Sequence, residues 1–168
     1  VVLDERESHY IEDMLTFNEH IVIQSRFDGI PLIEILNIES KKMSQIKMTD
    51  EVYDVSLAYN NNFNERFFRY SYSSLKTSPQ IYKYDLFESK NDVIWKKQVR
   101  NFFDSNYDVK RIKTSARDKT EVPVSIVYKK GLDLQNSPML VYGYGSYGIN
   151  MDSNFRSSII PLLDRGFI

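Results

Sequence analysis

Residues 20–38 predict a β-hairpin, and this feature limits the fold more than any other part of the sequence. Two runs rich in apolar residues, 20–27 and 31–38, flank the dipeptide Asp28-Gly29. Asp-Gly between two such runs is typical of a two-residue turn, because both turn residues need a positive φ. We therefore expect antiparallel β-sheet in the first part of the chain.

Further short strands are predicted at 52–59, 66–73, 80–87 and 93–97. In the second of these, Phe68, Tyr70 and Tyr72 alternate with polar residues, which is the pattern of a half-buried strand. The chain also contains 12 Tyr and 10 Phe, a composition that favours β-structure. Short strands at regular spacing with polar turns are typical of a β-propeller or a β-sandwich.

The pattern changes near residue 100, where we expect one domain to give way to another. Beyond this point the sequence predicts a hairpin of residues 108–115 and 121–129, an apolar strand at 139–142, and a helix over 157–165 that ends at Gly166. Phe167 and Ile168 begin another apolar element, so we expect the chain to be truncated.

Composition argues against several classes of partner. The 22 basic and 23 acidic residues give a net charge of -1, so we expect no nucleic acid and no anionic membrane as partner. There is no cysteine, which excludes disulfides, suits a reducing compartment and leads us to expect a cytoplasmic chain. The two histidines, His9 and His20, belong to no metal-binding motif, and we expect neither a metal nor a cofactor.

The stretch with most chemical interest runs from residue 138 to 152 and reads PMLVYGYGSYGINMD. Its glycines, Gly143, Gly145 and Gly148, have the G-x-G-x-x-G spacing of a dinucleotide-binding loop. Such a loop opens directly into a helix, whereas polar residues intervene here, so the sequence argues against a nucleotide site. Ser146 lacks the G-x-S-x-G setting of a nucleophile, and both histidines lie upstream of it, which is the wrong order for an α/β-hydrolase.

Several segments together resemble the prolyl oligopeptidase family of serine peptidases, in its oligopeptidase B branch. The family's last propeller strands are similar to RYSYSSLKTSPQIYKYDL, and the stretch leaving the propeller to VIWKKQ. The first hydrolase hairpin is similar to SARDKTEVPVSIVYKK, and the next segment to PMLVYGYGSYGINMDSNF…LLDRGFI. The resemblance implies a mixed, truncated fold: the last blades of a β-propeller over residues 1–100, then the first strands and helix of an α/β-hydrolase domain over 101–168.

The resemblance also implies a role for Tyr144, whose hydroxyl would donate to the oxyanion of the tetrahedral intermediate. Losing such a donor costs about 10²–10³ in rate. Gly143, Gly145 and Gly148 would let the backbone turn sharply beside it. At Lys119 the family has a glycine, and because a non-glycine at positive φ costs roughly 1 kcal/mol, we expect a different turn type there.

Asp152 and Asn154 fall on two acidic positions that, in this branch, help to bind basic residues of the peptide substrate. Asp152 keeps the charge, while Asn154 departs from the pattern. One carboxylate in place of two weakens the local field for a second Arg or Lys, so a preference for paired basic residues stays open.

The implied function is hydrolysis of short peptides after Arg or Lys by acyl transfer. The nucleophile, base and orienting aspartate would lie beyond Ile168, so we expect the isolated chain to be inactive. The alternative is a non-catalytic, propeller-like interaction module; the residues that follow Ile168 would separate the two. Half a propeller exposes strand edges, and we therefore also expect self-association.

Overall fold

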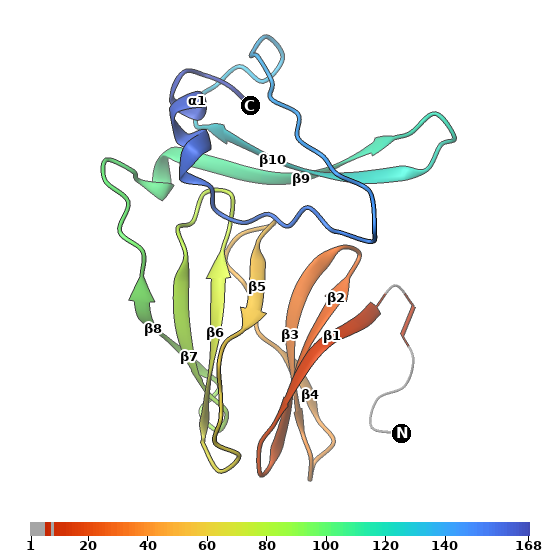
Figure 1. Cartoon of the computed structure of the whole chain (residues 1–168), viewed down its shortest axis with the longest axis vertical. Helices are drawn as coiled ribbons and strands as arrows, with labels where there is room; N and C mark the ends of the chain where they lie inside the picture. Colours follow the sequence, from red (N-terminus) through yellow and green to blue (C-terminus); the bar gives the residue numbers. More distant parts are fainter. Residues whose placement is uncertain (1–5, 8) are drawn as a thin grey trace. The chain divides into compact units, whose positions relative to one another are not determined.

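The computed structural model describes residues 6–7 and 9–168, which form mainly antiparallel β-structure (Figure 1). The strands are β1 (His9–Thr16), β2 (His20–Phe27), β3 (Ile30–Asn37), β4 (Met43–Gln45), β5 (Asp54–Leu57), β6 (Phe67–Ser73), β7 (Gln80–Asp85), β8 (Lys90–Lys96), β9 (Tyr107–Ser115) and β10 (Glu121–Lys129). The helical elements are η1 (Asp104–Asn106), η2 (Ser157–Ile159) and α1 (Ile160–Asp164). Among the described residues, no helix has the length and apolar character needed to cross a membrane.

The chain divides into two compact units, which are described separately. Unit 1 holds the described residues up to 48 together with 54–72 and 79–96. Unit 2 holds residues 49–53, 73–78 and 97–168. The chain therefore passes between the two units several times before it stays in unit 2.

Unit 1 is built from two four-stranded antiparallel sheets. The first has the strand order β1-β2-β3-β4 and the second the order β5-β6-β7-β8, so each strand pairs with its neighbour in sequence. Four-stranded antiparallel sheets of this kind are the blades of β-propellers. The predicted antiparallel sheet is confirmed, although the sequence did not predict β1 and β4, which lie at the edges of the first sheet.

The hairpin between β2 and β3 has the predicted two-residue turn. Phe27 pairs with Ile30, which leaves only Asp28 and Gly29 in the loop. Their φ angles are 48° and 78°, the left-handed values that a type I′ turn requires. Apolar side chains of β2 and β3 are buried on both faces of this sheet: Val22, Ile23, Leu32, Ile33, Ile35 and Leu36.

Tyrosine and phenylalanine rings fill the second sheet. Phe68, Tyr70 and Tyr72 are all buried, which confirms the predicted alternation in β6. Tyr70 stacks on its cross-strand neighbour Tyr82, with ring centroids 5.1 Å apart and planes 6° apart. The Tyr70 hydroxyl donates to Asn91 Oδ1 at 3.0 Å, and burial raises the pKa of this phenol. The ring stack and the hydroxyl contact together tie β6 to β7 and β8.

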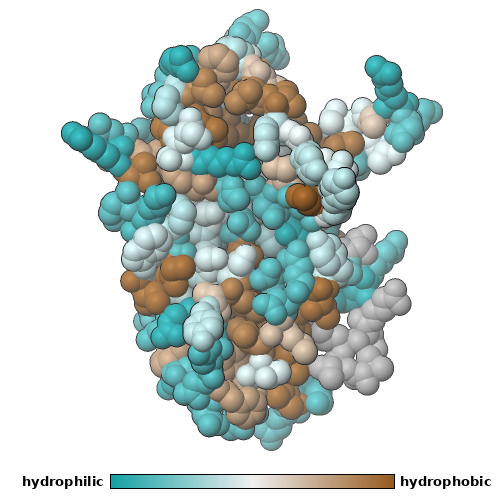
Figure 2. Space-filling model, viewed as in Figure 1, coloured by the Kyte–Doolittle hydropathy of each residue, from teal (hydrophilic) through white to brown (hydrophobic). Residues whose placement is uncertain are grey.

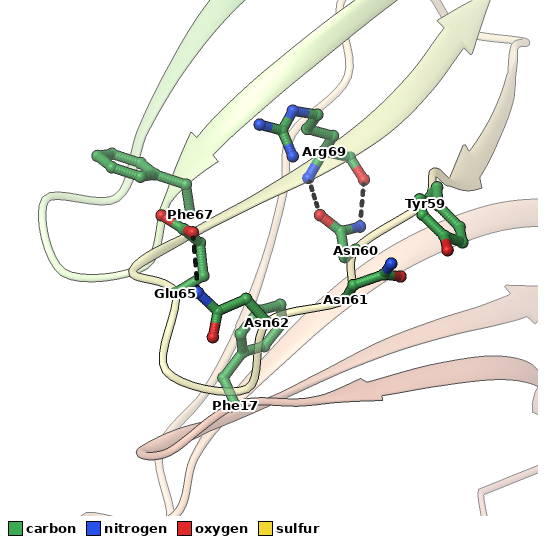
Figure 3. Close-up of a pocket in the computed structure, with 8 residues that line it drawn as sticks. All are labelled: Phe17, Tyr59, Asn60, Asn61, Asn62, Glu65, Phe67 and Arg69. Carbon is green, nitrogen blue, oxygen red and sulfur yellow. Dashed lines mark hydrogen bonds between the residues drawn. The ribbon is translucent and has the colours of Figure 1, made fainter.

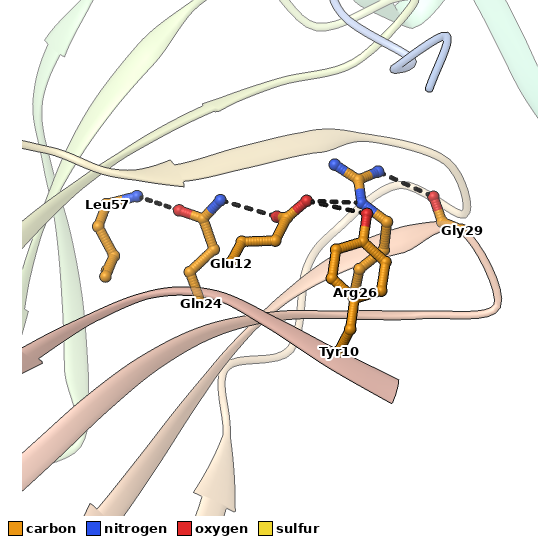
Figure 4. Close-up of polar contacts among 6 residues, drawn as sticks. All are labelled: Tyr10, Glu12, Gln24, Arg26, Gly29 and Leu57. Carbon is orange, nitrogen blue, oxygen red and sulfur yellow. Dashed lines mark hydrogen bonds and ion pairs between the residues drawn. The ribbon is translucent and has the colours of Figure 1, made fainter. Parts of the chain in front are cut away.

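A polar network joins the two sheets of unit 1 (Figure 4). Glu12 accepts hydrogen bonds from Gln24 Nε2 and Arg26 Nε, both at 2.9 Å. Gln24 Oε1 in turn accepts from the backbone N–H of Leu57 in β5, also at 2.9 Å. Arg26 is buried, and its second contact is the carbonyl of Gly29 at 3.0 Å. A buried guanidinium needs such partners, because an unpaired charge away from water is costly.

Unit 2 is organised around the β9–β10 hairpin. The two strands pair along their whole length, from Glu121 opposite Ser115 to Lys129 opposite Tyr107. The core of the unit lies where the base of this hairpin meets α1. It consists of Tyr107, Val127, Ile160 and Leu163, with Leu75, Phe102, Val109, Phe155 and Ile159 packed around them.

The C-terminal helical segment ends at the predicted stop signal, but the predicted helix over 157–165 divides into the 3₁₀ turn η2 and the shorter helix α1, which covers Ile160–Asp164. Pro161 lies in the first turn of α1, where the N–H that proline lacks is not needed. At the other end Gly166 has a φ of 85° and donates to the Leu163 carbonyl at 3.0 Å. Phe167 donates to the Leu162 carbonyl at 3.1 Å, and the two bonds together form a Schellman motif.

The predicted strand at residues 139–142 is not formed, and this expectation is wrong. The backbone of this stretch pairs with a single residue, Ile168, which donates to the Pro138 carbonyl at 2.9 Å and accepts from Leu140 N–H at 2.8 Å. Two bonds of this kind make one step of a parallel ladder. A strand requires at least a second step, so residues 139–142 remain extended coil.

Lys119 keeps the left-handed conformation that a glycine would favour, contrary to the expected change of turn type. Its φ is 70°, and its N–H donates to the Ala116 carbonyl at 2.9 Å. Ala116 N–H donates to the Thr120 carbonyl, also at 2.9 Å, which closes the β9–β10 loop. A residue with a Cβ is strained in this region of φ.

We predict that Lys119→Gly stabilises the chain. Glycine tolerates positive φ without strain, so the free energy of unfolding should rise by about 1 kcal/mol. Denaturant titration followed by circular dichroism measures this change. Lys119→Ala is the matched control, because it removes the same charge but keeps the Cβ and should bring no gain. Equal stability of the glycine and alanine variants would contradict the prediction.

Candidate functional site

The predicted site residues lie on the long coil between β10 and η2, drawn in blue in Figure 1. Residues 138–156 of this coil contain neither helix nor strand. Within it, Tyr144 precedes the glycine-rich turn, and Asp152 and Asn154 follow it. The coil is therefore the segment in which chemistry is expected.

A tight turn stands in the middle of the coil. Ile149 N–H donates to the Ser146 carbonyl at 3.2 Å, and the two residues between them, Tyr147 and Gly148, have φ angles of 58° and 66°. Both left-handed values together define a type I′ turn. The Tyr147 side chain is 93% exposed, so no packing holds this residue in its strained conformation.

The other two glycines are not required by the local backbone. Neither Gly143 nor Gly145 has a φ in the left-handed range, and a Cβ added at either would meet no atom within 4 Å among the described residues. Only Gly148 occupies a position that favours glycine conformationally. The described residues therefore give neither a conformational nor a steric reason for glycine at positions 143 and 145.

Tyr144 is positioned with its ring about half exposed, at 48%. Within the described part of the chain, no hydrogen bond to its hydroxyl is formed. A phenol in this setting can donate to an oxyanion that approaches from outside. This is the chemical capacity that the predicted role of Tyr144 requires.

The part of the coil after the turn is anchored to β10. Ser153 is buried and its hydroxyl donates to the Ser125 hydroxyl at 2.9 Å. Asp152 and Asn154, on either side of Ser153, are half-buried. The anchor therefore fixes the backbone from which both predicted substrate-binding side chains project.

Arg156 contacts two residues of the same coil, and sequence reasoning missed it. Its Nε donates to Asn154 Oδ1 at 3.4 Å, and its guanidinium carbon lies 4.9 Å from the centre of the Tyr142 ring. A guanidinium over an aromatic face is attracted by the ring quadrupole. The available signal was the charge itself, since Asp152 and Arg156 are the only charged residues between positions 134 and 163.

A polar cluster at the end of α1 holds this helix against the β9–β10 hairpin. Asp164 Oδ1 accepts from Lys129 Nζ at 2.8 Å and from the Tyr107 hydroxyl at 2.9 Å. The pKa of the Asp164 carboxyl is held below its usual range, mainly by the hydrogen bond from Lys129 and to a lesser extent by the one from Tyr107. Burial, reinforced by this carboxylate, raises the pKa of Tyr107 to about 12. Tyr107 is therefore a neutral hydrogen-bond donor at physiological pH.

Unit 1 contains a separate pocket of about 230 Å³ at the loop between β5 and β6 (Figure 3). Asn60 closes part of it: its amide donates to the carbonyls of Ala58 and Arg69 and accepts from Arg69 N–H. The guanidinium of Arg69 points away from the Tyr59 and Asn61 side chains in this view. Because the polar side chains around the pocket point in different directions, the pocket does not indicate a particular ligand. Nor do the described residues contain a cluster of three or more His, Asp or Glu side chains suited to a metal ion.

Comparison with known proteins identifies the family to which this chain belongs. The family described as prolyl oligopeptidase, N-terminal beta-propeller domain, matches residues 1–120, which is most of the chain. The two antiparallel blades of unit 1 agree with that description. The chain belongs to the prolyl oligopeptidase family.

Particular relatives match nearly the whole chain. It is 29% identical to dipeptidyl aminopeptidase BI of Pseudoxanthomonas mexicana and 27% identical to protease 2 of Moraxella lacunata, over 97% and 99% of its length. Oligopeptidase B from Trypanosoma brucei, with covalently bound antipain, superposes with a TM-score of 0.89 at 26% identity, and oligopeptidase B from Leishmania major with 0.88 at 28%. Each superposition covers 99% of this chain. The chain spans about a quarter of the length of these relatives, from 23% to 25%.

We predict that Asp164→Asn destabilises unit 2 in a pH-dependent way. At pH 7 the loss of the charged contacts should lower the free energy of unfolding by about 1 kcal/mol, a small value because the pair is partly exposed. Because the pKa of Asp164 is lowered by folding, its contribution is complete above about pH 4 and disappears as the pH falls further. The gap between wild type and variant should therefore close between about pH 4 and pH 2.

Thermal unfolding at a series of pH values measures that gap. Glu121→Gln is the control, since its contact with Lys113 on the same hairpin is an exposed ion pair and should contribute little. A gap of constant size down to pH 2 would contradict the assigned role of Asp164.

Proposed function

We propose that this chain is the junction segment of a serine oligopeptidase. In this proposal residues 1–100 form the last blades of the propeller, and residues 101–168 form the first strands and helix of an α/β-hydrolase domain. The family match and the two blades support the first part. The second part is supported by the order hairpin, coil, helix, and by the parallel pairing of Ile168 with the backbone of residues 138–140.

The proposed reaction is acyl transfer in which Tyr144 stabilises the oxyanion. A peptide carbonyl that is attacked by a serine develops negative charge on its oxygen, and a phenol O–H held nearby stabilises that charge. Tyr144 is half exposed and its hydroxyl has no hydrogen-bond partner among the described residues, and this observation carries the proposal. The nucleophile, the histidine base and the orienting aspartate would be supplied by residues outside this sequence. No cofactor or metal enters the proposal.

The proposed substrates are short peptides cleaved after Arg or Lys. Asp152 supports this choice because it is the one carboxylate of the coil between positions 134 and 163. The similarity to two solved oligopeptidase B structures supports it as well. A cytoplasmic location belongs to the same proposal and rests on the cysteine-free composition.

The test uses the full-length protein that contains this chain. Tyr144→Phe removes only the hydroxyl, so kcat for an Arg-containing peptide should fall about 10²–10³-fold with little change in KM. Tyr147→Phe is the matched control, because its ring is 93% exposed in the same coil and should leave kcat unchanged. Full activity of the Tyr144 variant would overturn the assignment of the oxyanion donor.

We also propose that the 168-residue chain by itself self-associates through β8. This strand is an edge of its sheet, and Val93, Ile94 and Trp95 are each about half exposed. Figure 2 shows that hydrophobic side chains reach the surface in several patches. An exposed apolar edge is a template for pairing with another chain. The same observation supports the alternative function, a propeller-like interaction module.

Sedimentation velocity at increasing concentration tests the self-association. The wild-type chain should form larger species, and Ile94→Lys should shift the distribution towards monomer because a charge on an edge strand opposes pairing. Tyr59→Lys adds the same charge at an exposed position outside the strands and should not have this effect. A monomeric wild-type chain at every concentration would contradict the proposal.

A further inference from the structure

The charge balance of the coil differs from that of a site built only to attract cations. Asp152 supplies one negative charge, and Arg156 supplies one positive charge four residues later. No other charged residue lies between positions 134 and 163. A second basic residue of a bound peptide would therefore meet an attractive and a repulsive charge on the same short segment.

The guanidinium of Arg156 is held within the coil. Tyr142, which precedes the glycine-rich turn, offers its ring face at 4.9 Å, and Asn154, which follows the turn, accepts from Nε at 3.4 Å. The Arg156 side chain is half-buried as a result. The guanidinium therefore places a fixed positive charge at this position of the coil.

The same contact changes what Asn154 offers to a ligand. Its carbonyl oxygen, the atom able to accept from a substrate cation, already accepts from Arg156 at 3.4 Å and keeps one lone pair for a second donor. A cation that approached this lone pair would lie beside the Arg156 guanidinium. The fixed positive charge therefore disfavours a basic residue at this point.

We propose that Arg156 is a specificity-determining residue that selects against a second basic residue in the peptide substrate. The residue before the cleaved bond remains Arg or Lys, and the residue preceding that one is preferred uncharged or acidic. This inference rests on the proposed peptidase function and refines it. It assigns the discrimination to Arg156, held by Asn154 and Tyr142, and leaves Asp152 as the single attractive charge.

The test compares two peptides in the full-length protein, one with Arg-Arg and one with Ala-Arg before the cleaved bond. Arg156→Gln removes the charge but keeps a polar side chain. The ratio of kcat/KM for Arg-Arg over Ala-Arg should rise about tenfold, because a fixed cation near the substrate cation is lost. Near-normal cleavage of the Ala-Arg peptide shows that the variant is folded.

Two further variants separate charge from structure. Arg156→Lys keeps the charge and should leave the ratio close to that of the wild type. Arg165→Gln removes an arginine at the end of α1, where it contacts the Pro161 carbonyl, and should not change the ratio. Added salt should narrow the difference in this ratio between the wild type and Arg156→Gln, since screening weakens an effect of charge and leaves a packing effect unchanged.

The outcomes distinguish this inference from the proposed function. If the wild type cleaves after Arg and the Arg156→Gln ratio stays unchanged, the inference is overturned and the proposed function stands. If the wild type cleaves neither peptide, the proposed function is overturned and the inference falls with it. A ratio that rises equally in Arg156→Lys and Arg156→Gln would assign the effect to packing and would also overturn the inference.

Discussion

The contact between Asp164 and the β9–β10 hairpin fixes the C-terminal end of the segment that contains the residues proposed to act in catalysis. Asp164 accepts from Lys129 and Tyr107, and the apolar residues of α1 pack on the base of the hairpin. The coil before the helical segment has no ladder of its own beyond one step with Ile168. Its course therefore depends on contacts at its two ends and on the hydrogen bond between Ser153 and Ser125.

In unit 1, polar side chains join two sheets that no backbone ladder connects. The two sheets do not share a strand, so no backbone ladder joins them, although Asn18 N–H in a loop of the first sheet donates to the Phe63 carbonyl in a loop of the second at 3.1 Å. Gln24 bridges them by accepting from Leu57 N–H, while Glu12 and Arg26 hold the glutamine in place. Satisfied networks of this kind are more rigid than isolated pairs, because each member restricts the next.

Much of the fold could be predicted from the sequence, and the parts that could not share a physical cause. Residues 20–27 and 121–129 were predicted with their observed bounds, because alternation and turn chemistry are local signals. Strand β1 was missed because most of its side chains are exposed, so burial imposes no alternation on it. The contact of Arg156 with Tyr142 was missed for another reason. It forms only once the coil folds back on itself, and neither residue predicts the other.

The side chain of Asn60 has a consequence for how this family can change in length. Its amide takes the place of a strand backbone opposite Arg69, so the last rung between β5 and β6 is a side chain. The loop that follows is therefore not responsible for the register of the two strands. An insertion after Phe63 would lengthen the loop and leave the Asn60 rung in place, whereas one that displaced Phe63 would break the contact of its carbonyl with Asn18 N–H. Natural variation in length, or an inserted affinity peptide, is therefore expected on the side of the loop next to β6.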